Sequence, residues 1–172
     1  MHLAPVPIAQ RPHHWASPIH QQHNFYQVSE SVFRSQQPHQ QLAALIAEHN
    51  IDVVLNLRPR SVAYPQLHVQ TLHVPIRTFT FSEQHIVAAL QHIQAAEAQG
   101  QKILVHCYHG ADRTGVVIAM YRIIMQHWAV ADAVAEMHHG GYGFHQIWQQ
   151  RFATLFTPEK IKWIRQQLAN PS

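Results

Sequence analysis

The chain is organised around Ile103-Leu104-Val105-His106-Cys107-Tyr108-His109-Gly110-Ala111-Asp112-Arg113-Thr114-Gly115. Its first residues are apolar and predict a buried strand, its middle is polar and predicts a loop, and the long apolar run that follows predicts a helix. The only cysteine, Cys107, comes directly after the strand, and Arg113 stands six positions later at the expected helix start. This arrangement indicates a site that holds a tetrahedral anion above a thiolate.

The chemistry of such a turn depends on the backbone of residues 107–113. A loop that leads into a helix has free N–H groups and lies at the positive end of the helix dipole. If the loop curls into a nest, these N–H groups stabilise the nucleophilic thiolate of Cys107 and bind phosphate oxygens. Gly110 permits close backbone approach, and Arg113 offers two parallel donors. The expected phosphate-binding residues are Tyr108, His109, Gly110, Ala111, Asp112 and Arg113.

Three polar side chains are expected to support the loop. Thr114 could donate its hydroxyl to Cys107 and stabilise the thiolate both as attacker and as leaving group. His106 could orient the loop through its ring nitrogens. Asn56, at the end of another predicted strand, could hydrogen-bond the loop backbone from below.

Residues 106–114 match the H-C-x5-R-[ST] loop of cysteine-dependent phosphatases, so the chain resembles the protein tyrosine phosphatase superfamily. Four further stretches occur in the order typical of small bacterial dual-specificity phosphatases: 25–29, 32–38, 54–58 and 140–145. The resemblance spans about residues 24–150, most of the chain. It implies a phosphate monoester hydrolase that forms a cysteinyl-phosphate intermediate on Cys107 with the help of Arg113, and that needs no metal ion or other cofactor.

The general acid of this superfamily has no obvious counterpart here. Its members usually carry an aspartate on a mobile loop roughly 25–35 residues before the cysteine, but the corresponding window, Leu72–Ser82, contains none. The nearest acid is Glu83, which could replace that aspartate or only complement the dipole of a helix that begins there.

Asp112 is the second candidate acid. Lipid phosphatases of the myotubularin type carry an aspartate immediately before the loop arginine, as this chain does. Asp112 could equally cap the helix or hold Arg113 in place. In a third interpretation no side chain serves as the acid, and good leaving groups then react far better than poor ones.

The resemblance implies phosphotyrosine, phosphoserine and phosphothreonine in proteins as substrates. Phosphoinositides are the alternative, favoured by Asp112 and by the missing loop aspartate, and a weakly catalytic phosphate-binding module is a third hypothesis. Arg58 and Arg77 are candidate substrate contacts, although such arginines are more often surface residues. Residues 140–145 are expected under the rim of the site, with Phe144 and Trp148 in the core.

The composition is that of a globular chain with an anionic partner. Of 172 residues 47% are hydrophobic, and the formal charge is +3. No run of lysine and arginine indicates a nucleic acid. The 17 histidines are scattered without the i, i+4 spacing of a helical metal site. A single cysteine excludes an intramolecular disulfide, and we expect a monomer.

The sequence shows no segment that would cross a membrane or direct secretion. Residues 1–18 lack the apolar core of a secretory signal, and no apolar run is long enough to span a bilayer. This pattern favours the cytoplasm. A signal removed before the numbering begins would instead place the protein in the periplasm.

Hydrophobic periodicity predicts an α/β fold. The expected elements are a hairpin over 24–35, strands over 52–57, 69–74 and 102–106, and helices over 38–50, 82–99, 111–127, 132–139, 146–156 and 159–168. Their alternation predicts a mainly parallel central sheet of about four to five strands with helices on both faces. We expect residues 1–23 to form an irregular arm and residues 24–172 a single phosphatase domain. Cys107, Arg58 and the loop 76–81 should meet at the carboxyl edge of the sheet.

Overall fold

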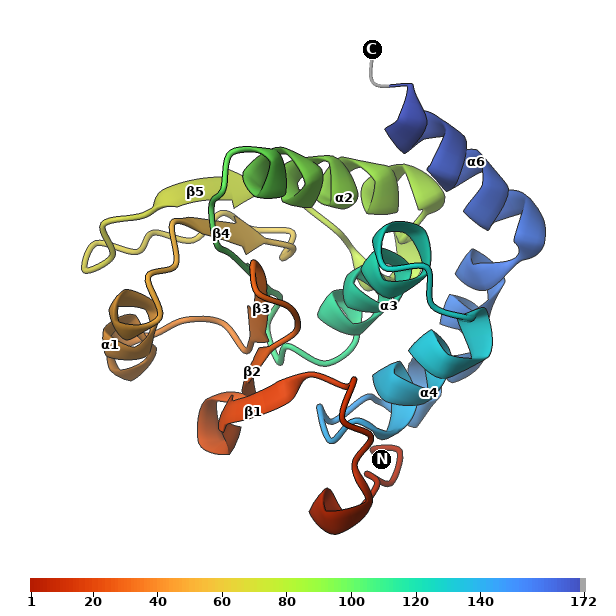
Figure 1. Ribbon diagram of the computed structural model, residues 1–172, viewed down its shortest axis with the longest axis horizontal. Coiled ribbons are helices and arrows are strands. Elements are labelled where there is room, and N and C mark those ends of the chain that lie inside the picture. The colour runs from red at the N-terminus through yellow and green to blue at the C-terminus, as the bar shows by residue number, and fades with distance from the viewer. Residues whose placement is uncertain (171–172) are drawn as a thin grey trace.

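A six-stranded sheet in the order β1-β2-β3-β6-β4-β5 forms the middle layer of the computed structural model, which describes residues 1–170 (Figure 1). The strands are β1 (Ser17–His20), β2 (Phe25–Gln27), β3 (Val32–Ser35), β4 (Val53–Asn56), β5 (Gln70–His73) and β6 (Ile103–His106). β3, β6, β4 and β5 are parallel, whereas β1 and β2 extend one edge in antiparallel fashion. The mainly parallel sheet is thus confirmed, with more strands than expected because β1 joins its edge.

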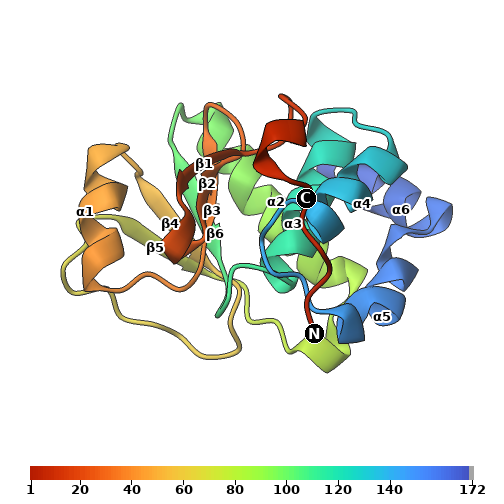
Figure 2. The ribbon, with the colours of Figure 1, turned by 90° about the horizontal axis from the view of Figure 1, so that it is seen from below.

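Helices cover both faces of this sheet, as expected. The α-helices are α1 (Gln40–Glu48), α2 (Glu83–Ala98), α3 (Arg113–Met125), α4 (Val130–His139), α5 (Gln149–Ala153) and α6 (Pro158–Ala169). α1 covers one face alone, and α2 and α3 cover the other, with α4 and α6 outside them (Figures 1 and 2). Within residues 1–170, no helix has both the length and the apolar character needed to cross a bilayer.

The central strands are buried on both faces, as their continuous apolar runs predict. In β6, Ile103 and Val105 join the core beneath α2 and α3, whereas Leu104 points to the opposite face. There it packs with Val54 of β4 and with Ile46 of α1. Side chains that alternate across a strand therefore supply two cores and fix the sheet between them.

The carboxyl ends of the parallel strands lie level with one another. His106 at the end of β6 pairs with Ser35 of β3 on one side and with Asn56 of β4 on the other, and Asn56 pairs with His73 of β5. The four loops that follow these residues consequently gather at one edge of the sheet, where open parallel sheets bind their ligands.

The expectation of an irregular arm over residues 1–23 is wrong for Ser17–His20, which forms β1 and pairs with β2. The arm is also tied to the C-terminal half by polar contacts. The Ala16 N–H donates to the buried Glu136 carboxylate at 2.7 Å, and Arg11 donates to the Tyr142 hydroxyl at 3.0 Å. These bonds depend on distant partners and not on local apolar periodicity, so the sequence pattern does not reveal them.

Candidate active site

The loop 107–112 forms a turn between β6 and α3. Cys107 is only 2% exposed, and the helix behind it is buried nearly all round, which gives the loop a stiff base. Gly110 has φ +74°, and a Cβ at this position would lie 2.3 Å from the Ser35 carbonyl oxygen. Only glycine lets the loop pass so close to β3, in agreement with the role expected of Gly110.

A buried arginine that the sequence did not single out lies beneath this loop. Arg34 of β3 is 1% exposed, and its guanidinium donates to the Gly110 carbonyl at 2.9 Å. The same guanidinium lies 3.5 Å from the centroid of the Tyr142 ring. Arg34 thus holds the phosphate loop from below, the place that the sequence had suggested for Asn56.

Asn56 instead shapes the loop that follows its own strand. Its Oδ1 accepts from the Arg58 N–H at 2.8 Å, and its Nδ2 donates to the Arg60 carbonyl at 2.9 Å. An asparagine at a strand end readily bonds the backbone two residues on, and here both the oxygen and the nitrogen of the amide bond the local turn. The expected contact between Asn56 and the phosphate loop is therefore wrong.

His106 lies against the loop, where an orienting role requires it. Its Nδ1–H donates to the Cys107 carbonyl at 2.9 Å, and its Nε2 accepts from the Tyr64 hydroxyl. Burial lowers the pKa of the imidazole to about 4. The ring is therefore neutral at pH 7, with each nitrogen assigned to one hydrogen bond.

This buried imidazole predicts that the protein loses stability in mild acid. Between about pH 6.5 and 4 the unfolded chain binds a proton at His106 that the folded chain does not. The free energy of unfolding is therefore highest above this pH range and falls as the pH is lowered through it. Once the pH is below about 4, His106 has lowered the free energy of unfolding by about 3 kcal/mol relative to pH 7. We expect the free energy of unfolding, measured with urea, to fall more steeply from pH 7 to pH 4 in wild type than in His106→Asn. Equal slopes in the two proteins would contradict this assignment.

Arg113 begins α3 beside Cys107, as expected. One of its terminal nitrogens donates to the Ile76 carbonyl at 3.1 Å, which ties the loop after β5 to the phosphate loop. The Thr114 hydroxyl is buried and has no hydrogen-bond partner among residues 1–170, so its expected bond to Cys107 is not made in this structure. Arg113 is held in place, and Thr114 retains a free donor.

The two candidate substrate arginines differ in their surroundings. Arg58 lies over the Tyr108 ring at 4.9 Å and donates to the Gln37 side chain. It thus meets the phosphate loop at the carboxyl edge, as expected. Arg77 is exposed and precedes the short turn Thr78–Thr80.

The structure separates the two candidate acids. Asp112 lines the same pocket as Cys107, and its Oδ2 accepts from the His145 Nδ1–H at 2.6 Å. Glu83 does not line that pocket; it lies in the first turn of α2, with an oxygen 3.9 Å from the Lys160 ammonium. Asp112 is therefore the carboxylate that the fold brings to the cysteine, and Glu83 complements a helix dipole and a lysine.

A pocket of about 230 Å³ opens above the cysteine. Its lining residues are Thr78, Cys107, His109, Asp112, Arg113, His145, Ile147 and Trp148. Phe144 is buried in the core, as expected, and Trp148 packs against the same core while it also lines the pocket. Burial, followed by the charge of His145, lowers the pKa of His109. The pocket combines the Cys107 thiol, the Arg113 guanidinium and the Asp112 carboxylate.

Three large apolar side chains are exposed at or beside this pocket and form its rim: Ile147 lines the pocket, whereas Phe79 and Tyr108 directly follow the lining residues Thr78 and Cys107. Ile147 is 78% exposed, Phe79 is 69% exposed and Tyr108 is 54% exposed. Phe79 also packs edge-on against Trp148, with ring centroids 5.0 Å apart. Large exposed apolar side chains around a polar pocket are typical of a binding surface. No periodic sequence pattern predicts this rim, because its three residues come from different loops.

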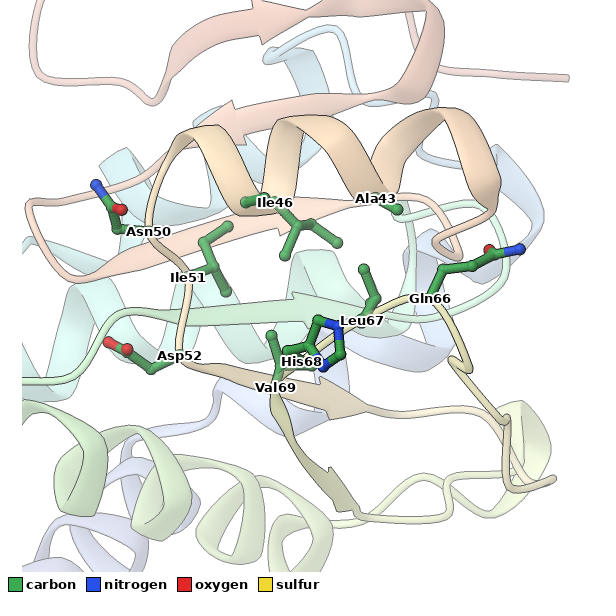
Figure 3. A pocket seen from close by; sticks show the side chains of 10 residues that line it. Ala43, Ile46, Asn50, Ile51, Asp52, Gln66, Leu67, His68 and Val69 are labelled. Carbon is green, nitrogen blue, oxygen red and sulfur yellow. The ribbon is translucent and has the colours of Figure 1, made fainter.

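A second pocket, of about 270 Å³, lies between α1 and the segment before β5 (Figure 3). Ile46 and Ile51 line one side, and Leu67 and Val69 line the other. It contains neither the cysteine nor an arginine. Among the described residues 1–170, no group of three His, Cys, Asp or Glu side chains is arranged to hold a metal ion. The pocket at Cys107 is therefore the candidate active site.

The chain is similar in sequence and fold to several known phosphatases. The model of the family described as "Dual specificity phosphatase, catalytic domain" matches residues 32–151. The dual specificity protein phosphatase TpbA of Pseudomonas aeruginosa is 34% identical over 131 residues, 75% of this chain. The chain spans 60% of the length of that curated relative. A crystal structure of a Cys-to-Ser form of TpbA in complex with pTyr has a TM-score of 0.81 at 29% identity and covers 94% of this chain and 99% of that one.

A more distant relative acts on a different kind of substrate. The inositol diphosphatase DSP2 of Oryza sativa subsp. japonica is 27% identical over 157 residues, 80% of this chain and 72% of that relative.

Proposed function

The chain belongs to the family of dual specificity phosphatase catalytic domains, and on this premise we propose that it hydrolyses phosphate monoesters of proteins through a cysteinyl-phosphate intermediate. The observation that carries the proposal is one pocket in which Cys107, Arg113 and Asp112 meet. Together they supply a nucleophile, a cation for the phosphoryl oxygens and a carboxyl group for proton transfer.

The mechanism has two steps. The Cys107 thiolate attacks phosphorus while the bond to the leaving oxygen breaks, and Asp112 protonates that oxygen. Arg113 and the loop N–H groups stabilise charge on the equatorial oxygens. Water then attacks the cysteinyl phosphate, Asp112 accepts a proton, and the thiolate is released. No step requires a metal ion.

The rim favours a phosphorylated tyrosine in a protein as substrate. Ile147, Phe79 and Tyr108 offer apolar surface to an aromatic ring and its neighbours. Phosphoserine and phosphothreonine reach the same cysteine with fewer rim contacts. The pTyr complex of TpbA supports this choice by analogy.

Phosphoinositides are the second candidate, supported by Asp112 immediately before Arg113 and by the inositol diphosphatase relative. Against it, Arg58 is already engaged by Tyr108 and Gln37, which leaves few free cations at the rim for additional phosphates.

A substrate panel tests the proposal. Phosphotyrosine, phosphoserine and phosphothreonine peptides and soluble phosphoinositides are compared by kcat/KM, with vanadate as inhibitor and a chelator present. We expect vanadate-sensitive, chelator-resistant turnover, fastest on phosphotyrosine. Faster turnover of phosphoinositides would overturn the protein-substrate assignment, and phosphate binding without turnover would indicate a binding module. Sedimentation of the same sample tests the expected monomer.

We expect Ile147→Ala to raise KM for a phosphotyrosine peptide while leaving kcat nearly unchanged. The substitution removes apolar contact surface worth about 1 kcal/mol, which corresponds to roughly a fivefold rise in KM. The matched control is Ile8→Ala, because Ile8 is also largely exposed but does not line the pocket. A fall in kcat at constant KM would contradict a role for the rim in binding.

A further inference from the structure

We propose that His145 is a positioning residue that forms a proton-sharing couple with Asp112, and that this couple takes the place of the missing loop aspartate. The inference rests on the proposed function, because it concerns the acid of that reaction. His145 stands 33 positions after Asp112, so no sequence spacing links them.

His145 holds both oxygens of the Asp112 carboxylate. Its backbone N–H donates to Oδ1 at 2.8 Å, and its ring Nδ1–H donates to Oδ2 at 2.6 Å. Two donors from one residue fix the position and the rotation of the carboxyl group. Both residues line the pocket above Cys107.

The backbone around His145 is itself anchored. The Phe144 side chain is fully buried, and its carbonyl accepts from the Leu3 N–H at 2.9 Å. On the other side the Gln146 N–H donates to the Met1 carbonyl at 2.9 Å. The N-terminal residues thus pair with the segment that carries His145 and hold the imidazole in place before substrate arrives.

The couple gives the reaction a proton that a lone carboxyl would have lost at neutral pH. A carboxyl ordinarily releases its proton near pH 4, whereas an imidazole does so at about pH 6.5. With one added proton, the couple is an imidazolium beside a carboxylate, or equivalently a carboxylic acid beside an imidazole.

Both chemical steps balance with this single proton. In the first step the S–P bond forms, the P–O bond breaks, and the leaving oxygen takes the proton from the Asp112 carboxyl. In the second step the oxygen of water bonds to phosphorus, the S–P bond breaks, and the proton of water returns to the couple. Cys107 ends as the thiolate with which it began.

Other titratable and charged groups face the couple from three elements. From the N-terminal arm, the His2 Nε2 lies 3.1 Å from the His145 Nε2. From the phosphate loop come Cys107 and the His109 ring, whose centroid is 5.3 Å from that of His145. Arg113 faces it from the start of α3. A positive charge on either neighbouring histidine would disfavour the imidazolium form, so the couple keeps its added proton best when both neighbours are neutral.

The test compares His145→Asn with wild type on aryl phosphates of graded leaving-group acidity. Asparagine can keep a donor near the Nδ1 position but cannot hold the extra proton. We expect kcat to fall about 100-fold with phosphotyrosine and only a few-fold with p-nitrophenyl phosphate. In a plot of kcat against pH, the alkaline limb should move to lower pH by more than one unit. The double variant His145→Asn/Asp112→Asn should be no slower than Asp112→Asn alone, because both substitutions remove the same couple.

Vanadate affinity and urea unfolding show whether the variant is folded, and His145→Gln serves as a second variant. The control is His68→Asn, an exposed histidine outside the pocket. If kcat fell equally for all leaving groups and the alkaline limb of its pH profile did not move, the proposed His145–Asp112 couple would be wrong. The proposed phosphatase activity would still stand. Absence of wild-type turnover on every ester would overturn the proposed function, and the couple with it.

Discussion

Cys107→Ser is expected to abolish turnover of a phosphotyrosine peptide while preserving its binding. A serine hydroxyl stays protonated at neutral pH, and a neutral hydroxyl is a far weaker nucleophile than a thiolate. Loss of a sole nucleophile should lower kcat by at least about 10⁴-fold. The side chain is buried at the end of β6 and changes little in volume, so the loop and Arg113 should keep their positions.

Two measurements separate loss of chemistry from loss of the site. Calorimetry should give the same peptide affinity for Cys107→Ser and wild type within about threefold, and single-turnover assays should detect no phosphate release. Rapid acid quenching of wild type should trap phosphate on Cys107. Turnover above the contamination limit in the serine variant would mean that another group attacks phosphorus, and the cysteinyl-phosphate mechanism would have to be abandoned.

The phosphate loop was predictable because its determinants are local. The apolar strand 103–106, Cys107, Gly110 and Arg113 lie within eleven positions of one another, and the structure places them as the strand–loop–helix turn that this order indicates. The parallel sheet was predictable for a similar reason, since continuous apolar runs mark strands that are covered on both faces.

Contacts between polar groups far apart in the chain were not predictable. Arg34 meets Gly110 across 76 positions, and a charged residue in a strand gives no local indication that it is buried. The sequence predicts a contact between Asn56 and the phosphate loop because both stand at strand ends, but the Asn56 side chain bonds the nearby backbone of residues 58 and 60 instead. The same limit explains why Asp112 could be named as an acid candidate while its partner His145 could not.

Gly110→Ala is expected to remove most of the activity, because two independent costs fall on this position. The residue has φ +74°, which an L side chain adopts only with strain, and the added Cβ would lie 2.3 Å from the Ser35 carbonyl oxygen and 2.6 Å from the Gln36 nitrogen. Since both contacts are to backbone, the loop itself must move. Its N–H groups would then point away from the phosphoryl oxygens, and we expect kcat to fall by about 100-fold or more.

Gly100→Ala is the matched control, because it separates backbone strain from collision. Gly100 also has a positive φ, +68°, but a Cβ there meets nothing within 4 Å, and it lies beyond the end of α2. We expect Gly100→Ala to lower the free energy of unfolding by about 1 kcal/mol and to leave kcat unchanged. Gly110→Ala should lose both stability and kcat, together with vanadate affinity, since the same N–H groups bind the anion. If Gly110→Ala retained wild-type vanadate affinity, the close passage of the loop over Ser35 would not be what forms the phosphate site.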